Sequence, residues 1–127
     1  MKALKWFLPV LISAWCAGAL AQGYPARPVK VVLPVPAGGY YDMVTRVVSQ
    51  KLTERLGQPV VVENRVGAGG IVGTEYAAKA APDGYTILFN GIGAMSIFPS
   101  LHSKLPYDPI RDFVPIILVS GVQNIAV

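Results

Sequence analysis

Cysteine is almost absent from this chain. The only one among the 127 residues is Cys16, inside an apolar N-terminal segment. Residues 22–127 therefore contain no disulfide, no thiolate metal site and no cysteine nucleophile. His102 is the single histidine, and no carboxylate residue stands beside it. Because a metal site needs several ligands, we expect no metal and no cofactor.

The motifs of nucleotide-binding proteins and serine hydrolases are also missing. The dinucleotide fingerprint would require glycine at positions 67, 69 and 72, but position 72 is Val72. Neither G-x-x-x-x-G-K-[ST] nor G-x-S-x-G occurs. We therefore expect no enzymatic activity. A small Rossmann-like enzyme remains an alternative, although the dinucleotide fingerprint that such an enzyme would need is missing.

Charged residues make up only 14% of the chain and form no basic block. Without Lys2 and Lys5, nine Lys and Arg residues stand against seven Asp and Glu residues, a formal net charge of +2. Because these basic residues are dispersed along the chain, they do not indicate nucleic-acid binding. A mild positive excess suits a small anionic ligand.

The N-terminal segment has the features of a secretory signal peptide over residues 1–21. Lys2 and Lys5 precede an apolar stretch, and residues 19–21 (ALA) match the small-x-small cleavage pattern. The apolar stretch is shorter than the roughly 20 residues that span a bilayer. We expect export to the periplasm with cleavage after Ala21, and a first α/β lobe over residues 22–127.

The remainder alternates between short apolar runs and amphipathic stretches. Strands are predicted at residues 29–33, 60–63, 85–89 and 114–120, with another beginning at 123–127. Helices are predicted at residues 40–56 and 71–81, with a short helical turn at 97–101 and a surface loop at 105–113. Such alternation is typical of an α/β fold with a parallel sheet.

Each predicted helix has an apolar stripe that we expect to face the sheet. The first stripe consists of Val44, Val47, Val48, Leu52 and Leu56. The second consists of Val72, Tyr76 and Ala80.

Three loops rich in small residues follow the predicted strands, at 36–41, 65–70 and 90–96. Ligands of open parallel sheets bind beyond the carboxyl ends of the strands. The first two loops run into helices, whose initial N–H groups and partial positive charge suit a carboxylate. The other interpretation is that these glycines only form turns.

The candidate ligand-binding residues lie in or beside these loops. Asp42 is interpreted as a helix cap, or alternatively as a group that shapes the pocket. Arg65 either pairs with a ligand carboxylate or is a solvated surface residue. The full set is Ala37, Gly38, Gly39, Tyr40, Tyr41, Asp42, Arg65, Gly67, Ala68, Gly69, Gly70 and Ser96.

Seven segments in order resemble the Bug-type solute receptors of tripartite tricarboxylate transporters. They are residues 24–29 (YPARPV), 34–42 (PVPAGGYYD), 57–65 (GQPVVVENR), 67–70 (GAGG), 80–86 (AAPDGYT), 99–101 (PSL) and 105–113 (LPYDPIRDF). The resemblance implies one lobe of a periplasmic binding protein of the Venus flytrap type. It also implies a small carboxylate ligand, such as a di- or tricarboxylate or an acidic amino acid, and the membrane subunits of the transporter as partners.

The sequence departs from the family pattern in the first loop and in length. Where the family has a small residue and then threonine, this chain has Tyr40 and Tyr41. Family members are more than twice as long, so the resemblance implies a truncated first lobe whose second lobe is missing. A remnant that binds nothing is the alternative to a receptor.

Overall fold

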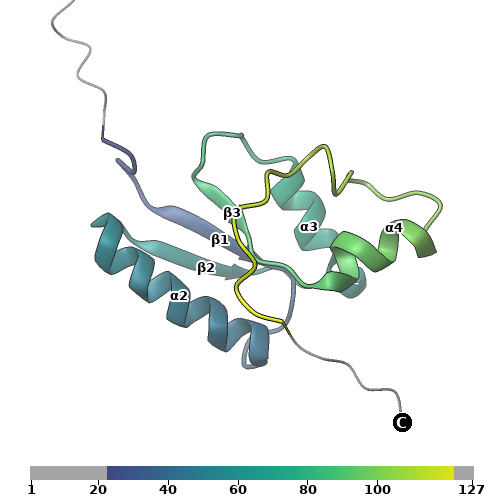
Figure 1. Ribbon diagram of the computed structural model, residues 1–127, viewed down its shortest axis with the longest axis horizontal. Helices are drawn as coiled ribbons and strands as arrows, with labels where there is room; N and C mark the ends of the chain where they lie inside the picture. Colours follow the sequence, from purple (N-terminus) through teal and green to yellow (C-terminus); the bar gives the residue numbers. More distant parts are fainter. Residues whose placement is uncertain (1–22, 122–127) are drawn as a thin grey trace, which may run out of the picture.

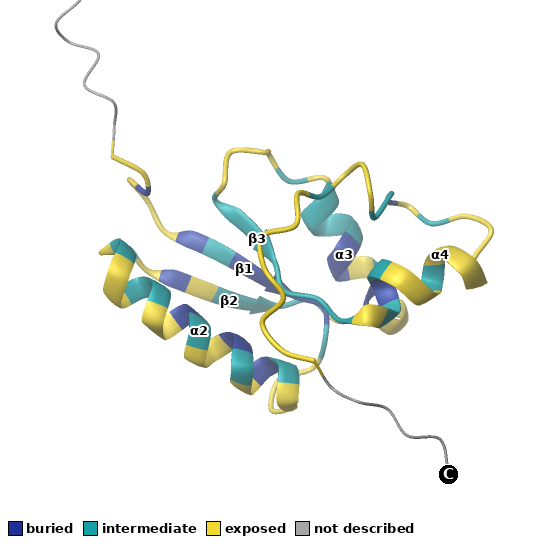
Figure 2. Ribbon diagram, viewed as in Figure 1, coloured by how far each residue is buried: buried dark blue, intermediate teal, exposed yellow. Residues whose placement is uncertain are grey.

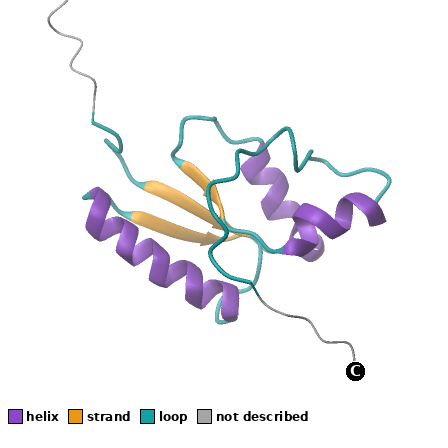
Figure 3. Cartoon of the chain, viewed as in Figure 1, coloured by secondary structure: helices purple, strands orange, loops and turns teal. Residues whose placement is uncertain are grey.

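The fold, a computed structural model described over residues 23–121, is built on a small parallel sheet (Figures 1 and 3). Strand β1 (Val29–Leu33) lies between β2 (Val60–Asn64) and β3 (Thr86–Leu88), and both pairings are parallel. Helix α2 (Tyr40–Leu56) connects β1 to β2, and helix α3 (Ile71–Ala78) connects β2 to β3. The predicted α/β class, the parallel sheet and its first three strands are therefore confirmed.

Helices α2 and α3 cover opposite faces of the sheet. Val29 and Val31 form the core on one face, where Leu52 and Leu56 of α2 pack against them. Figure 2 shows β1 mostly in the colour of buried residues. Because side chains alternate along a strand, Lys30 points to the other face. There its Nζ donates a 2.9 Å hydrogen bond to the hydroxyl of Tyr76 in α3.

The buried face of α2 is more polar than the predicted stripe. Its buried residues are Asp42, Thr45 and Ser49, whereas Val47 is 58% exposed, so its prediction as a core residue is wrong. The other stripe residues, Val44, Val48, Leu52 and Leu56, are partly buried. Thr45 is tolerated inside because its hydroxyl donates to the carbonyl oxygen of Tyr41 at 2.6 Å.

Helix α3 is shorter than predicted and buries different residues. It ends at Ala78 instead of residue 81, and the N–H of Ala80 donates to the oxygen of Ala77, three residues back. The buried side of the helix holds Gly73 and Thr74, while Val72 is 48% exposed. The helix approaches the loops so closely at Gly73 that a Cβ atom there would clash with the Arg65 carbonyl oxygen.

The segment after β3 is helical over a longer stretch than predicted. A π-helical turn (Gly93–Ile97) leads directly into α4 (Phe98–Leu101). The predicted turn at 97–101 is confirmed, and residues 93–96 of the expected third loop are part of the helical segment. The surface loop at 105–113 is confirmed as turns without a strand.

The predicted fourth strand at residues 114–120 is wrong. The segment is irregular, and its apolar side chains are exposed, with Val114 at 88% and Leu118 at 85%. An apolar run becomes a strand only when a neighbouring strand pairs with its backbone, and the sheet of the described residues stops at three. The strand expected at 123–127 lies outside the described residues.

Replacing Gly73 by alanine tests how closely α3 approaches the loops. A Cβ atom there would lie 2.5 Å from the Arg65 carbonyl oxygen and 2.8 Å from Cβ of Pro34. Alanine favours helix by about 1 kcal/mol over glycine, but we expect the clash to dominate and lower the free energy of unfolding by about 1–3 kcal/mol. Urea unfolding measures it. The control Gly39→Ala, which meets nothing within 4 Å, should change stability little.

Candidate functional site

The loops that follow the three strands meet at the carboxyl edge of the sheet. Parallel pairing on both sides of β1 brings all three strand ends to this edge. The second loop lies close to the end of β1, since a Cβ atom added to Gly70 would lie 3.4 Å from the carbonyl oxygen of Pro34. The third is tied to α3, because Asn90 Nδ2 donates to Thr74 Oγ1 at 2.9 Å. The predicted gathering of the loops at one edge is therefore confirmed.

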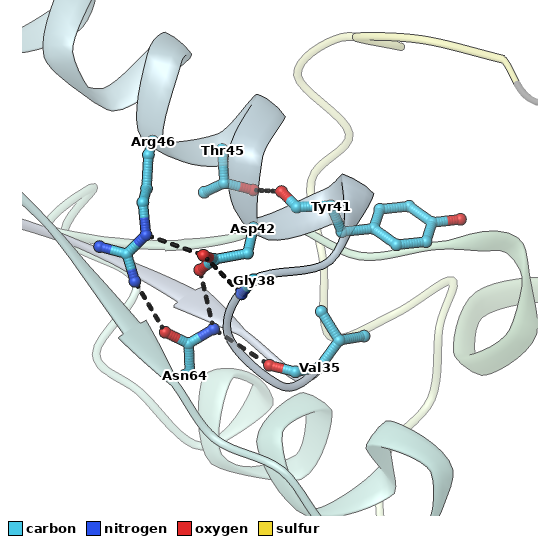
Figure 4. Close-up of polar contacts among 7 residues, drawn as sticks. All are labelled: Val35, Gly38, Tyr41, Asp42, Thr45, Arg46 and Asn64. Atoms are coloured by element: carbon cyan, nitrogen blue, oxygen red, sulfur yellow. Dashed lines mark hydrogen bonds and ion pairs between the residues drawn. The ribbon is translucent and has the colours of Figure 1, made fainter.

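The carboxylate of Asp42 organises the first loop (Figure 4). It accepts the N–H of Gly38 at 3.0 Å and Nε of Arg46 at 2.9 Å, both on Oδ2. Its Oδ1 accepts Nδ2 of Asn64 at 3.1 Å, and the same Nδ2 donates to the carbonyl oxygen of Val35 at 3.0 Å. One side chain thus joins the loop after β1, the first turns of α2 and the end of β2.

These contacts keep Asp42 ionised. The guanidinium of Arg46, the Gly38 N–H and the Asn64 amide together hold the pKa of the Asp42 carboxyl far below its usual range, against the opposing effect of burial. The residue is 5% exposed. Its position in the first turn of α2 suits the helix dipole. Its carboxylate caps none of the first N–H groups of the helix and instead bonds the Gly38 N–H, so the prediction that it caps those groups is wrong. With both oxygens engaged, Asp42 acts on the loop instead of offering a free carboxylate.

The beginning of α2 presents backbone N–H groups that the rest of the described chain does not use. Gly39 is the N-cap, and the first helical bond runs from the N–H of Met43 to its carbonyl oxygen at 3.0 Å. Within residues 23–121, no hydrogen bond involves the N–H groups of Gly39, Tyr40 or Tyr41. The amide of Gly38 is occupied by Asp42. In the first loop, the available N–H groups therefore begin at Gly39, one residue after the occupied amide of Gly38.

The second loop folds into a tight turn of residues with positive φ. Four successive residues have positive φ, namely Gly67, Ala68, Gly69 and Gly70. The N–H of Gly70 donates to the Gly67 oxygen at 2.9 Å, so this amide is not free. No bond among the described residues uses the N–H groups of Ala68 and Gly69. Chains of amides in such a conformation commonly form anion-binding concavities.

Arg65 is placed in a cluster on the face covered by α3. Its guanidinium pairs with the Glu63 carboxylate at 2.5 Å and lies 3.5 Å from the centroid of the Tyr76 ring. The side chain remains 38% exposed. Since Glu63 and Tyr76 already engage this guanidinium, its predicted pairing with a ligand carboxylate stays a prediction.

The remaining predicted residues differ in how closely they join the loops. Ala37 is an exposed residue of the first loop. Tyr41 is half-buried, Tyr40 is 50% exposed, and their rings meet edge to face with centroids 5.8 Å apart. Ser96 is exposed on the π-helical turn, and within the described residues no hydrogen bond joins it to the glycine loops.

Sequence reasoning missed two polar residues that hold the loops together. Asn64 bonds both Asp42 and the first loop. Thr74 is fully buried, donates to the Gly70 oxygen at 2.8 Å and accepts from Asn90. Asn64 lies at the end of a strand just before a glycine loop. From that position in the sequence, its side chain could have been predicted to bond the backbone of a neighbouring loop. No sequence pattern predicts the role of Thr74, because its burial depends on how closely α3 packs against the loops.

Two kinds of feature are absent from the described part of the chain. No helix in residues 23–121 is long and apolar enough to cross a membrane. In the same residues, no group of three or more His, Cys, Asp or Glu side chains is placed to hold a metal ion.

An open parallel sheet with glycine loops and helix beginnings at its carboxyl edge defines an α/β ligand-binding lobe. Residues 44–127 match the model of the tripartite tricarboxylate transporter family receptor. The chain belongs to this family of solute-binding receptors, as its motifs had indicated.

Curated and solved relatives agree with this assignment. Protein BugT of Bordetella pertussis is 44% identical over 108 residues, which are 84% of this chain and 33% of BugT. The solved periplasmic binding protein BugD is 47% identical, with a TM-score of 0.69 over 73% of this chain and 31% of BugD. MatC of Rhodopseudomonas palustris, solved with bound malate, is 40% identical, with a TM-score of 0.72 over 76% of this chain and 33% of MatC. The chain thus spans about a third of the length of these relatives. The family to which it belongs is one of receptors and not of enzymes.

The variant Asp42→Asn tests the carboxylate that holds the first loop. Because the folded pKa lies below the ordinary value of 3.8, the charged form stabilises the fold above about pH 4 and this contribution is lost as the pH falls further. We expect the variant to unfold at lower urea than the wild type at pH 7, with a difference that narrows below about pH 4.

The matched control is Glu54→Gln, which removes a carboxylate from the exposed ion pair with Lys51. It should leave the urea midpoint nearly unchanged at pH 7, because exposed pairs contribute little. A difference for Asp42→Asn that is the same at pH 7 and at about pH 3 would contradict the role of the charge.

Proposed function

We propose that this chain is the first lobe, residues 22–127, of a periplasmic receptor for a small carboxylate. The ligand is a di- or tricarboxylate or an acidic amino acid. The first two glycine loops hold one carboxylate of the ligand, and the loaded receptor delivers it to the membrane subunits of a tripartite tricarboxylate transporter.

The observation that supports this proposal most is that two loops at the same edge of the sheet each contain amides without an internal acceptor in the described part of the chain. These amides belong to Gly39, Tyr40 and Tyr41 in the first loop and to Ala68 and Gly69 in the second. A related receptor of the same fold was solved with malate, a carboxylate of the proposed kind. The chemistry of the edge and the ligand of the relative therefore agree.

Carboxylates suit such an edge for an electrostatic reason. Backbone N–H groups at a helix beginning carry partial positive charge and have no helical acceptor of their own. The one buried acid nearby, Asp42, is paired with Arg46 at 2.9 Å and so does not repel an incoming anion strongly. A neutral ligand would gain less from these donors, since hydrogen bonds to an ionised acceptor are stronger.

This lobe provides only part of the contact surface of a receptor. The loop residues 36–40 are all exposed. Tight sites for small ligands are concave and bury most of the ligand surface. We therefore expect the 127-residue chain by itself to bind a carboxylate with a dissociation constant of about 1 mM or weaker.

Nuclear magnetic resonance of the ¹⁵N-labelled chain detects binding this weak. Titration with malate should shift the amide signals of Gly39 and Gly69 together, while signals of the far end of α2 stay in place. Dispersed spectra confirm that the chain is folded. Shifts confined to other regions would contradict the proposal. A micromolar dissociation constant would contradict only the expectation that this lobe binds weakly by itself.

A matched pair of variants at Gly39 isolates a single amide. Gly39→Pro removes the N–H at a residue whose φ of −86° is close to what proline requires, whereas Gly39→Ala keeps the N–H and meets no other atom within 4 Å. We expect malate binding to weaken about tenfold in the proline variant and less than twofold in the alanine variant, because a hydrogen bond to an anion is lost only in the first. Equal affinities would show that this amide does not contact the ligand.

Export belongs to the same proposal. The signal peptide at residues 1–21 lies outside the described residues. Expression in a Gram-negative host should release a periplasmic product that begins at Gln22, and N-terminal sequencing of that product checks the cleavage site. A product that keeps Met1, or that stays in the membrane fraction, would contradict export with cleavage after Ala21.

A further inference from the structure

We infer that Asn90 and Gly91 form a site of spontaneous covalent modification, at which Asn90 loses its side-chain amide and the loop after β3 is released from α3. This chemistry belongs to the chain itself and does not depend on which ligand the lobe binds. Three observations support it: the bonding of the Gly91 nitrogen, the contrast with Asn64, and the contact of the Asn90 amide with α3.

The reaction joins the side chain of Asn90 to the backbone of the next residue. The Gly91 nitrogen loses its proton to a base in the solvent and forms a bond to Cγ of Asn90. The bond from Cγ to Nδ2 breaks, and Nδ2 leaves as ammonia. Water then opens the cyclic imide at one of its two carbonyl carbons, which leaves aspartate or isoaspartate at position 90. The net change is the gain of water and the loss of ammonia, and a glycine at the attacking position presents no Cβ atom to hinder it.

The backbone around Gly91 leaves its nitrogen available for this reaction. Residues 89–91 lie between β3 and the π-helical turn and belong to no helix or strand. Within residues 23–121, the only acceptor of the Gly91 N–H is Oδ1 of Asn90 itself, at 2.8 Å. The attacking nitrogen therefore lies beside the amide with which it reacts, and no backbone hydrogen bond has to break first.

Asn64, the other asparagine of the described residues, lacks these features. It is the last residue of β2, and the N–H of Arg65 donates to the carbonyl oxygen of Leu33 at 2.8 Å. Its Nδ2 donates to both Val35 and Asp42. Attack on this side chain would break a bond at the end of the sheet and two side-chain bonds. Asn64 is therefore an internal control within the same chain.

Modification of Asn90 removes the donor that connects the loop after β3 to α3. Its Nδ2 donates to Oγ1 of Thr74 at 2.9 Å, and the Thr74 hydroxyl uses its one proton on the oxygen of Gly70 at 2.8 Å. A carboxylate at position 90 has no proton to donate, so an unpaired acceptor would remain beside the fully buried Thr74. Isoaspartate also adds a carbon to the backbone beside Gly91, where a Cβ atom would already lie 2.8 Å from the Tyr41 hydroxyl oxygen. Both products therefore loosen the loop.

Ageing of the full 127-residue chain in mildly alkaline buffer, with and without denaturing urea, tests the reaction. Trypsin separates the two asparagines into residues 80–104 and residues 56–65, and fragment masses follow the change from amide to carboxylate in each. We expect Asn90 to convert in the folded protein within about tenfold of its rate in urea, because a single bond to another residue restrains its amide. Asn64 should stay unmodified in the folded protein over the same period.

Two results would overturn the inference. The first is an Asn90 that converts in urea but stays intact in the folded protein. The second is a folded protein in which Asn64 converts as fast as Asn90. In either case the bonding of the attacking nitrogen does not control the modification.

Two variants separate the attacking nitrogen from the contact with α3. Gly91→Ala keeps the N–H but adds a Cβ atom, for which the end of the Tyr41 side chain has to shift, and should slow conversion about tenfold. Thr74→Val removes the acceptor of Nδ2 and should speed conversion about fivefold. Val47→Ala, at an exposed position of α2, is the control that should leave the rate unchanged. Equal rates in all three variants would contradict the role of this geometry.

The variant Asn90→Asp reproduces one product directly and tests the release of the loop. We expect the N–H groups of residues 89–94 to exchange with deuterium about tenfold faster in this variant, and in fully aged wild type, than in fresh wild type. Far residues such as those of the second half of α2 should exchange at unchanged rates. Aged protein that exchanges like fresh protein, although Asn90 has converted, would show that the modification does not release the loop.

Discussion

The buried carboxylate of Asp42 is the contact on which the loop arrangement depends. It accepts hydrogen bonds from the backbone of the first loop, from a side chain one turn along the helix, and from the last residue of a neighbouring strand. Few groups other than an ionised carboxylate can accept from three such donors at once. By occupying the amide of Gly38, it turns the loop so that the next N–H groups are left without an internal acceptor.

Parallel pairing on both sides of β1 is the second constraint. It places the beginnings of α2 and α3 at the same edge although the helices cover opposite faces. The positive-φ turn at residues 67–70 and the close approach of Gly73 to Pro34 then bring the second loop near the start of the first. The anion site that we propose is therefore a product of sheet topology, with side chains acting mainly to hold backbone amides in place.

Much of this fold was predictable because its signals are local. A β-branched run bounded by proline predicted β1 with its observed bounds, and Gly57 marked the end of α2 by adopting the left-handed conformation expected of a helix C-cap. Predictions that required knowledge of neighbours were less successful. Residues 114–120 have the composition of a strand but no pairing partner among the described residues, and Val47 belongs to an apolar stripe but faces solvent.

The sequence by itself determined the class of fold, the family and the three loops, since these follow from the order of apolar runs, glycines and motifs along the chain. Only the tertiary structure decided which amides are available, because hydrogen bonds with Asp42 and within the second loop consume some and spare others. It also decided that Arg65 faces Glu63 and Tyr76 and that Tyr41 rests on Gly91. These are contacts between residues distant in sequence, whose geometry depends on how the elements pack together.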